Sequence, residues 1–495
     1  MNNNETQQLE RTLWDAANKL RGNINSSDYK YVVLGLIFIK YVSDAFETQF
    51  AKYKVEGFDE SDEDFLRDYL TKDNIFYVPP TARWKYLQDH AKTPQIGELV
   101  DKAMDAIEKE NKSLKGVLPT NYGREELDKT RLGELIDLFT NKIRFGADSK
   151  DLLGRVYEYF MGMFADSEGK HGGEFYTPRS IVRLLVAMIQ PFKGRVYDPC
   201  CGSGGMFVSS EDFVAEHSGR IGDIAIYGQE LNTTTWRLAK MNMAIRGIDA
   251  RLEQGDTLQD DKLKDLKFDF ILANPPFNIS DWGQARAQDD VRWQFGTPPA
   301  GNANYAWIQH IVHHLSPAGV SGFVMANGTM TSNTSGEGDI RRRIVEAGLV
   351  DCIIACPDKL FFNVTLPCCL WFVSRDRANR KDKTLFIDAR KLGFMESRKT
   401  RNLAESDIQK ITAKYHKFVS TGVTTDEPGF AKVATLEEIR KNGFALTPGL
   451  YVGSEAVADD GDLDQQIANL KAELLAGFEK GRALEEKIIY NLKEV

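Results

Sequence analysis

The 495-residue sequence is poor in cysteine, has no long apolar run and shows no excess of basic residues. Its six cysteines include two adjacent pairs and no Cys-x-x-Cys spacing, which argues against a disulfide framework and a structural zinc site. The absence of any run of about 18 apolar residues excludes a membrane-spanning helix. The segment beginning at Met1 lacks the basic and apolar stretches of a signal peptide. We therefore expect a reduced, cytoplasmic protein with no membrane association.

Acidic residues outnumber basic residues by 72 to 63, which gives a net charge of −9. Such a balance argues against a protein that binds nucleic acid through a uniformly positive surface, but it leaves a local basic groove possible. One such region is residues 375–402, which hold ten Lys or Arg against four Asp or Glu. This stretch either follows nucleic-acid phosphates or forms the solvated edge of a hairpin.

The distribution of apolar residues divides the chain into three parts: 1–150, 151–402 and 403–495. The first part is predicted to be a helical domain, because 31–46 is uniformly apolar and 95–115 is amphipathic. In the third part, 460–492 is predicted to form one helix with apolar residues near a heptad register, weakened by Gly477 and Gly481. That apolar stripe either packs within the chain or docks on a partner.

The middle part alternates short apolar runs with helical patterns, which is typical of an α/β fold whose parallel sheet has helices on both faces. Strands are predicted at 195–198, 224–228, 268–273, 320–326, 351–355, 368–374 and 384–388, with a further edge at 251–255. Helices are predicted at 178–190, 232–246, 303–315 and 338–347. The last two strands are too close in sequence for a helical crossover, so we expect them to form an antiparallel hairpin.

A glycine-rich segment, Asp198-Pro-Cys-Cys-Gly202-Ser203-Gly204-Gly205, follows the first predicted strand and precedes a helix. It lacks the Gly-Lys-Ser/Thr of a phosphate-binding loop and the Gly-x-Gly-x-x-Gly spacing, and its leading Asp disfavours phosphate. Glu230 ends the next strand, where an acid binds ribose hydroxyls in doubly wound folds, and Asp256 follows the third. Three acids around a glycine loop indicate a nucleoside ligand with an amino group and no phosphate. S-adenosylmethionine fits this description.

The segment Asn274-Pro275-Pro276-Phe277 ends an apolar strand and is the most specific signal in the sequence. An exocyclic amino group on a base is a poor nucleophile because its lone pair is delocalised. Two acceptors, the Asn274 side-chain oxygen and the Pro275 carbonyl, would localise that lone pair, and the prolines hold both acceptors in place. Phe277 offers a face on which a flipped base can stack. The motif predicts methyl transfer to an amino group.

At these residues the chain resembles amino-group DNA methyltransferases, and specifically the modification subunits of type I restriction-modification systems. The resemblance covers nearly the whole chain and includes two further segments, Gly172-Gly-Glu-Phe-Tyr-Thr-Pro-Arg179 and Pro299-Ala-Gly-Asn-Ala-Asn-Tyr-Ala-Trp307. It implies a Rossmann-like S-adenosylmethionine-dependent methyltransferase sheet and methylation of adenine N6. The cofactor-binding residues that it implies are Glu174, Phe175, Tyr176, Thr177, Pro178, Arg179, Asp198, Gly202, Ser203, Gly204, Glu230 and Asp256.

The same resemblance implies several partners. These are double-stranded DNA, a specificity subunit that reads the target and is normally shared by two modification subunits, and a separate motor-nuclease subunit for cleavage. Leu450 stands where this family suggests an arginine. Two other functions stay open: methylation of a protein glutamine amide, and a non-catalytic scaffold.

Three further features have competing interpretations. The long loop 278–302, which contains Trp282, Arg286, Arg292 and Trp293, is expected to close over the flipped base or the DNA backbone. Cys200 and Cys368 each follow a proline, as a nucleophilic cysteine does in some methyltransferases, but we expect buried structural thiols. His310, His313 and His314 lie on one predicted helix with no acidic cluster beside them, so we interpret them as surface or packing residues and not as metal ligands.

Overall fold

The computed structural model describes residues 26–454 except 56–68, 71–74, 144–158, 161–176, 218, 221, 287, 362–366 and 398–399, together with scattered helical residues in 11–18 and 468–485. It contains two compact units, Met1–Val452 and Gly453–Val495. No helix among the described residues has the length and apolar character needed to cross a membrane.

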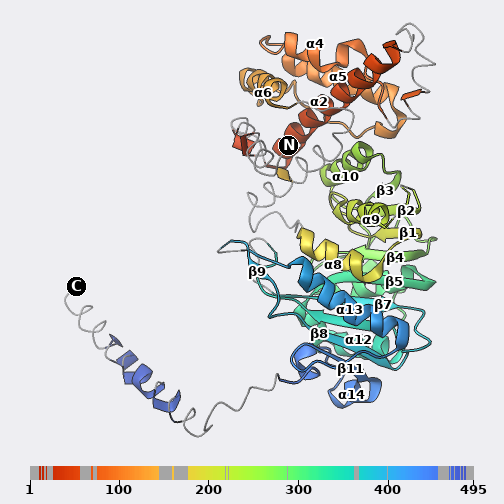
Figure 1. Cartoon of the computed structure of the whole chain (residues 1–495), viewed down its shortest axis with the longest axis vertical. Coiled ribbons are helices and arrows are strands. Elements are labelled where there is room, and N and C mark those ends of the chain that lie inside the picture. Colours follow the sequence, from red (N-terminus) through yellow and green to blue (C-terminus); the bar gives the residue numbers. More distant parts are fainter. Residues whose placement is uncertain are drawn as a thin grey trace. The chain divides into compact units, whose positions relative to one another are not determined.

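The N-terminal region is helical, as predicted (Figure 1). Its helices in the described part are α2 (Ser26–Val55), α4 (Trp84–Asp89), α5 (Ile96–Glu110) and α6 (Lys129–Lys142). The apolar stretch 31–46 lies within α2 and is almost entirely buried, and the amphipathic stretch corresponds to α5. Leu238, Met241 and Ile245 of a later helix, α10 (Thr233–Arg246), belong to the same hydrophobic core. The helical region therefore packs on the sheet-containing part through α10.

A nine-stranded mixed sheet forms the centre of the first unit, with strand order β11-β8-β6-β7-β5-β4-β1-β2-β3. Its strands are β1 (Gly194–Asp198), β2 (Ile224–Glu230), β3 (Ala250–Gln254), β4 (Phe268–Ala273), β5 (Leu315–Ala326), β6 (Val350–Ala355), β7 (Cys368–Ser374), β8 (Lys383–Asp388) and β11 (Ala431–Thr435). β7 and β11 are antiparallel to their neighbours, and the other pairs are parallel. All eight strands expected from the sequence are present, and β11 was missed.

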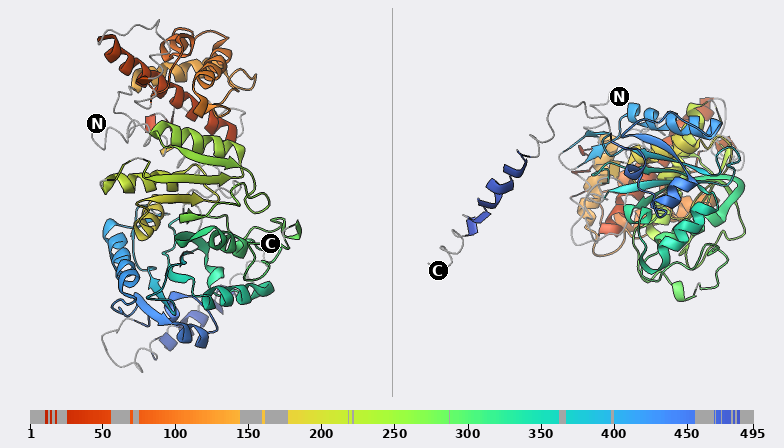
Figure 2. Two further views of the ribbon diagram at one scale, coloured as in Figure 1. Left: turned by 90° about the vertical axis from the view of Figure 1, so that its right-hand side faces the viewer. Right: turned by 90° about the horizontal axis from the view of Figure 1, so that it is seen from below.

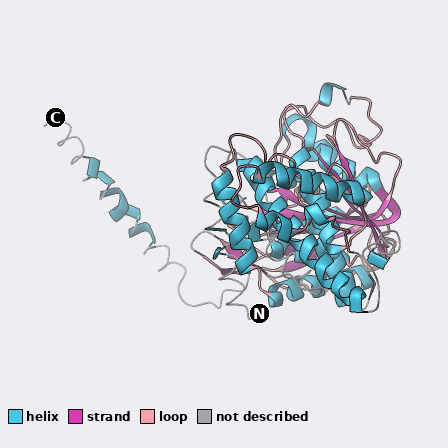
Figure 3. Cartoon of the chain, turned by 90° about the horizontal axis from the view of Figure 1, so that it is seen from above, coloured by secondary structure: helices cyan, strands magenta, loops and turns pink. Residues whose placement is uncertain are grey.

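Helices cover both faces of this sheet (Figures 2 and 3). The helices are α8 (Arg179–Ile189), α9 (Gly205–Glu216), α10, α11 (Asn304–His314), α12 (Glu337–Glu346), α13 (Glu405–Thr421) and α14 (Leu436–Lys441). Side chains of β7 alternate between the two cores, because successive residues of a strand point to opposite faces. Leu370 and Phe372 pack with α8 and α13, whereas Trp371 and Val373 pack with α11 and α12. The sheet is therefore buried on both sides.

The sheet contains an antiparallel strand pair next to β8, but it joins β6 and β7 and not, as expected, β7 and β8. β7 pairs with β6, and β6 lies between β7 and β8, with which it is parallel. The β7–β8 connection is too short for a helix but long enough to pass the end of β6. Arg377 and Arg380 of this connection donate to the Asp351 carboxylate of β6 at 3.1 and 2.8 Å. These buried ion pairs fix the connection across β6.

The second unit contains the predicted C-terminal helix. Its described residues, all between 468 and 485, are helical and exposed. They include the apolar residues Leu470, Leu474, Leu475, Phe478 and Leu484, each more than half exposed. Leu463, Ile467 and Ile488 of the predicted stripe lie outside the described residues.

Candidate active site

The predicted site residues lie where parallel strands end. Asp198 is the last residue of β1, Glu230 is the last of β2, and Asn274 directly follows β4. β1 pairs in parallel with both β2 and β4, so the three residues share the carboxyl edge of the sheet. Ligands of doubly wound sheets bind at this edge.

The loop after β1 is a left-handed turn that requires glycine. Gly202 and Gly204 have φ values of +54° and +83°, and Gly204 caps the N-terminus of α9. A Cβ on Gly202 would meet nothing within 4 Å, so the backbone borders open space there. The Ser203 carbonyl accepts a hydrogen bond from the Asn242 side chain at 2.9 Å, which ties the loop to α10. The loop can therefore approach a ligand closely without losing its shape.

Asp198 is buried, and its carboxylate accepts a hydrogen bond from the Cys200 backbone N–H at 2.9 Å. Burial, reinforced by the nearby Glu230 and opposed by the hydrogen bonds from Cys200, raises the pKa of Asp198 to about 7. A carboxyl in this state is poised to become charged when a cationic group binds beside it.

The other two acids are also held by hydrogen bonds. Glu230 accepts from the backbone N–H of Gly202 at 3.0 Å and of Asn232 at 2.8 Å, so it links the glycine loop to the start of α10. Asp256 accepts from the backbone N–H groups of Leu258 and Gln259 at 3.0 and 3.2 Å. Both carboxylates thus have fixed orientations at the ends of neighbouring strands.

Asn274 presents an unpaired acceptor. Its side-chain N–H donates to the Thr177 hydroxyl at 2.9 Å, which orients the amide. Its side-chain oxygen is buried and accepts no hydrogen bond from any described residue. A buried acceptor without a donor costs free energy, and such groups persist mainly where a ligand supplies the partner. The geometry fits an amino group arriving at Asn274 Oδ1.

The rest of the motif supports that acceptor. Pro275 is buried, and Phe277 is half-buried with its ring 6.4 Å from that of Phe361 in an edge-to-face arrangement. Asn278, at φ +54°, exchanges two hydrogen bonds with Asn304 at the start of α11. The main chain on the C-terminal side of the motif is thereby fixed.

The loop 278–302 packs against the protein. Trp282 and Trp293 are buried, form an edge-to-face pair at 5.7 Å, and contact Trp307 and two alanines of the same cluster. The Trp282 indole also donates to the Pro299 carbonyl at 2.9 Å. The apolar area of both tryptophans is used to fold the loop, and the expectation that the loop closes over the flipped base or the DNA backbone stays a prediction. The Arg286 side chain lies outside the described residues.

Arg292 is the centre of a network that sequence analysis missed. Its buried guanidinium donates to the carbonyl oxygens of Thr257 and Leu258 at 2.9 and 2.6 Å, and to both carboxylate oxygens of Asp290. It also donates to Nδ1 of His310 at 3.0 Å. Arg292 thus joins the loop after Asn274 to the segment after Asp256.

The histidines of α11 form a cluster with an acid, contrary to the expectation. His310, His314 and Asp261 place possible ligand atoms within 4.8 Å of one another, because the turn before β4 brings Asp261 to the helix. His314 Nε2 lies 2.8 Å from Asp261, and His310 Nε2 lies 3.0 Å from the Tyr197 hydroxyl. With Arg292 on its other nitrogen, His310 has no free ring atom, and the guanidinium repels a cation. We interpret His310 and His314, both fully buried, as packing residues.

The two cysteines that follow prolines are not activated. Burial raises the pKa of the Cys200 thiol well above its usual range, and Cys368 is buried in β7. The nucleophile is the thiolate, so neither environment favours covalent catalysis.

Three predicted cofactor residues, Glu174, Phe175 and Tyr176, lie outside the described residues. Their neighbours Thr177, Pro178 and Arg179 lie at the start of α8, where Pro178 occupies the cap position and Arg179 is exposed. Thr177 contacts Asn274 directly, so this segment reaches the Asn274–Phe277 tetrapeptide.

The basic stretch 375–402 separates into two parts. At the edge of the sheet opposite Asn274, Arg375 donates to the Val312 carbonyl. Arg377 and Arg380 donate to the Asp351 carboxylate at the same edge. These three arginines are structural, so of the two interpretations of this stretch, contact with phosphates is not supported for its first part. The second part, from Arg390, follows β8 at the carboxyl edge.

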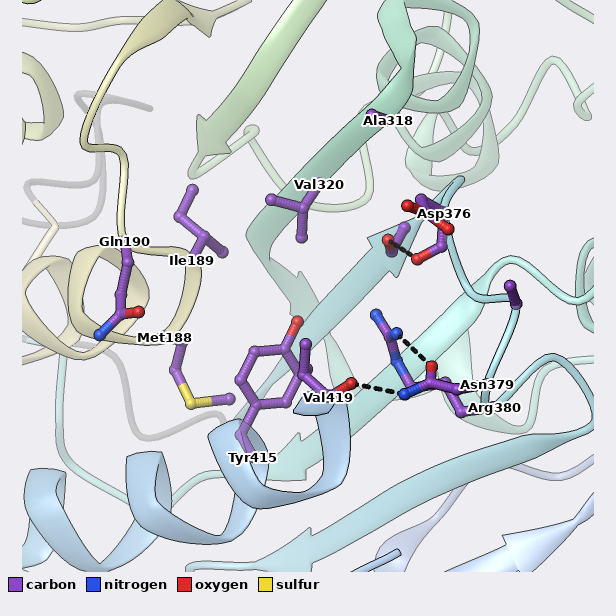
Figure 4. A pocket seen from close by; sticks show the side chains of 12 residues that line it. Met188, Ile189, Gln190, Ala318, Val320, Asp376, Asn379, Arg380, Tyr415 and Val419 are labelled. Carbon is purple, nitrogen blue, oxygen red and sulfur yellow. Dashed lines mark hydrogen bonds between the residues drawn. The ribbon is translucent and has the colours of Figure 1, made fainter. Parts of the chain in front are cut away.

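A cavity of about 500 Å³ also lies at the opposite edge, between α8, α13 and the ends of β5 and β7 (Figure 4). Its polar side chains bind one another: Arg380 donates to Asn379 at 3.0 Å, and Asn379 donates to the Val419 carbonyl at 2.9 Å. No predicted site residue lines this cavity, and we assign it no catalytic role.

The mixed sheet, the glycine loop after β1 and the acids at the strand ends together identify the class of protein. The chain is an α/β protein of the S-adenosylmethionine-dependent methyltransferase class. Two family models match the sequence: N-6 DNA methylase over residues 148–460 and the HsdM N-terminal domain over 9–139. The chain therefore belongs to the N-6 DNA methylase family, among the methylase subunits of type I restriction enzymes.

Similar proteins support this assignment. The HindI methylase subunit of Haemophilus influenzae is 45% identical over 84% of this chain and 99% of its own length. The MjaIX methylase subunit of Methanocaldococcus jannaschii is 41% identical over 99% of this chain and 91% of its own. A type I methyltransferase subunit of Streptococcus thermophilus has a similar crystal structure, with a TM-score of 0.76 and 26% identity over 90% of this chain and 99% of that chain.

The raised pKa of the Asp198 carboxyl predicts how the affinity for the cofactor depends on pH. With its pKa near 7, Asp198 is neutral in acid, and a cationic ligand favours the charged form. We expect the affinity for S-adenosylmethionine to rise with pH up to about 7 and then to level off, as measured by calorimetric titration. Asp198→Asn should weaken binding and remove this dependence.

Glu211 provides the control, because burial also raises its pKa to about 7 but it lies on α9, away from the strand ends. Glu211→Gln should keep the wild-type pH profile. An unchanged profile in Asp198→Asn would contradict the role given to Asp198.

Proposed function

We propose that this chain methylates N6 of a flipped adenine in double-stranded DNA, with S-adenosylmethionine bound at the carboxyl edge of the sheet. The observation that carries the proposal is the buried, unpaired oxygen of Asn274 directly after β4. Adenine N6 carries two hydrogens, and this oxygen would accept a hydrogen bond from one of the two N–H groups.

The catalytic roles follow from the chemistry of an amino group. Asn274 Oδ1 and the Pro275 carbonyl accept hydrogen bonds from the two N6–H groups and direct the nitrogen lone pair toward the incoming methyl group. The hydrogen bond to Thr177 keeps the amide in the orientation that presents its oxygen. Phe277 stacks on the flipped base, and its contact with Phe361 limits rotation of its ring. Bound S-adenosylmethionine supplies an electrophilic methyl group.

Cofactor binding is assigned to the glycine loop and the acids. Asp198 faces the methionine ammonium, Gly202, Ser203 and Gly204 form the floor, and Glu230 binds the ribose hydroxyls. Asp256 binds the adenine amino group, and residues 174–179 line the methionine end. The residues present fit such a ligand, since the Gly202 backbone borders open space between the strands that end in Asp198 and Glu230.

We further propose that target recognition belongs to a separate specificity subunit, shared by two copies of this chain, and that a motor-nuclease subunit joins them for cleavage. Support comes from the exposed apolar face of the C-terminal helix. Leucines and a phenylalanine exposed on one helix are typical of a helix that docks on a partner.

The test is transfer of labelled methyl from S-adenosylmethionine to duplex DNA, with this chain alone and with its specificity subunit added. We expect methylated adenine when both proteins are present, and loss of this stimulation when the chain ends at Gly453. Methylation by the chain alone would contradict delegated recognition. Cofactor binding without any DNA methylation would favour a glutamine-amide substrate or a scaffold.

A further inference from the structure

Helix α10 belongs to two hydrophobic cores at once. Leu238, Met241 and Ile245, each at most 2% exposed, pack in the core of the N-terminal helical region. Ala239 and Met243, one turn apart on another face, pack in the core that includes residues of β1 and β2. The position of α10, which is labelled between these two regions in Figure 1, therefore depends on packing in both of them.

The glycine loop after β1 rests on the second of these faces. The Asn242 side-chain N–H donates to the Ser203 carbonyl at 2.9 Å, and Ser203 lies between the left-handed residues Gly202 and Gly204. A Cβ on Gly204 would lie 2.9 Å from the terminal methyl group of Met243, so no gap separates the loop from the helix there. A displacement of α10 therefore reaches the loop through a hydrogen bond and through a direct contact.

The start of α10 is joined to the same loop. Asn232 caps the helix, and its backbone N–H donates to the Glu230 carboxylate at 2.8 Å. The other oxygen of that carboxylate accepts from the Gly202 N–H at 3.0 Å. The loop is thus attached to α10 at two points along the helix.

The orientation of the Asn242 amide is set within α10. Asn242 is buried, and its side-chain oxygen accepts from Arg246 Nε, one turn further along the helix, at 3.4 Å. Because Arg246 binds the oxygen, the amide presents its nitrogen to Ser203. Asn242 therefore transmits the position of α10 to one specific atom of the loop.

The other side of α10 contacts α2 of the N-terminal helical region. The Arg237 guanidinium lies over the Tyr31 ring, 5.8 Å from its centre, and the Tyr31 hydroxyl donates to the Val117 carbonyl. Tyr31 is buried, so little water screens the attraction between the cation and the ring. A change in the packing of α2 therefore acts on α10.

From these contacts we infer that Asn242 is a positioning residue for the cofactor loop and that the N-terminal helical region sets the affinity for S-adenosylmethionine through α10. The inference rests on the proposed function, because it takes the glycine loop as part of the cofactor site. Glycine-rich backbone has great conformational freedom, so a loop released from α10 would have to be ordered again when the ligand binds. The coupling runs through packed side chains and hydrogen bonds that the two regions share.

The variant Asn242→Leu tests the role of Asn242, because it keeps the approximate volume of the side chain and removes the donor to Ser203. We expect the dissociation constant of S-adenosylmethionine to rise about tenfold in a calorimetric titration, since one hydrogen bond corresponds to about one power of ten. In methyl transfer to DNA with the specificity subunit added, the KM for the cofactor should rise similarly, whereas kcat at saturating cofactor should fall by less than about twofold. A lower kcat with an unchanged KM would overturn the positioning role.

The variant Tyr31→Leu tests the coupling to the N-terminal region. Arg237→Met is the milder second variant, because it removes the other partner of the same contact without emptying the core. Each change alone should weaken cofactor binding by about threefold. In the Asn242→Leu background the same changes should have no further effect, since the connection to the loop is already broken.

Ile136→Ala is the matched control, because Ile136 is fully buried in the same core but lies on α6, which packs against α4 and α5. It should lower the free energy of unfolding and keep the cofactor affinity within about twofold of wild type. An equal loss of affinity in Ile136→Ala would overturn the coupling, as would normal affinity in both Tyr31→Leu and Arg237→Met. Effects that multiply fully in the double variants would overturn the route through Asn242. A wild-type chain that binds no S-adenosylmethionine would instead show that the proposed function itself fails.

Discussion

Asn274→Ala is expected to abolish methyl transfer while leaving cofactor binding intact. The substitution removes an acceptor that no described residue uses, so it costs little stability but deletes one of the two groups that polarise the amino nitrogen. Removal of a single preorganised electrostatic group from an active site lowers kcat by about 10²–10³-fold, and we expect at least that loss. Single-turnover transfer to DNA and a calorimetric titration of the cofactor measure the two effects.

Thr177→Val is the matched variant for this prediction. It keeps Asn274 but removes the hydroxyl that accepts from its side-chain N–H at 2.9 Å. We expect an intermediate loss of about tenfold, because the amide can then rotate and present its nitrogen to the substrate. If Asn274→Ala turned over at the normal rate, the assigned role would be refuted. An equal loss of cofactor affinity would instead show that Asn274 belongs to the cofactor site.

Arg292→Met is expected to give the largest structural effect that reaches the active site. The change removes the guanidinium that donates to two backbone carbonyls, to the Asp290 carboxylate and to His310. Breaking a buried ion pair by removing one partner costs about 3–5 kcal/mol. The loop after Asn274 and the segment after Asp256 would lose their common attachment, so kcat should fall by about 10²-fold even below the unfolding temperature.

Denaturant unfolding and kinetics below the unfolding transition separate the two effects. Arg342→Met serves as the control, since Arg342 forms an exposed pair with Asp339 on α12 and should change stability by less than about 1 kcal/mol. A full retention of kcat in folded Arg292→Met would show that the network stabilises the protein without positioning the site.

The sequence predicted the elements that carry the chemistry more fully than it predicted their pairing. β1, β2 and β4 were foreseen because buried parallel strands are short apolar runs, and the positions of Asp198, Glu230 and Asn274 at their ends follow from that placement. The β7–β8 hairpin was wrong because β6, a strand from earlier in the chain, lies between these two strands, and local patterning does not encode such an insertion.

Within the site, short motifs were predictable and long-range contacts were not. The glycine loop and the Asn274 tetrapeptide were read from local spacing. The Arg292 network joins residues 257, 258, 290 and 310, and nothing in the sequence between them signals the contact. The packing of Trp282 against Trp293 was not predictable either, because an aromatic residue in a long loop can fold the loop as readily as it can meet a ligand.

The most direct test of the account is the identity of the methylated group. DNA methylated by this chain with its specificity protein should be digested to nucleosides and analysed by mass spectrometry. The account predicts N6-methyldeoxyadenosine as the labelled product and its absence with Asn274→Ala. Label in N4-methyldeoxycytidine, or in protein and not in DNA, would contradict it.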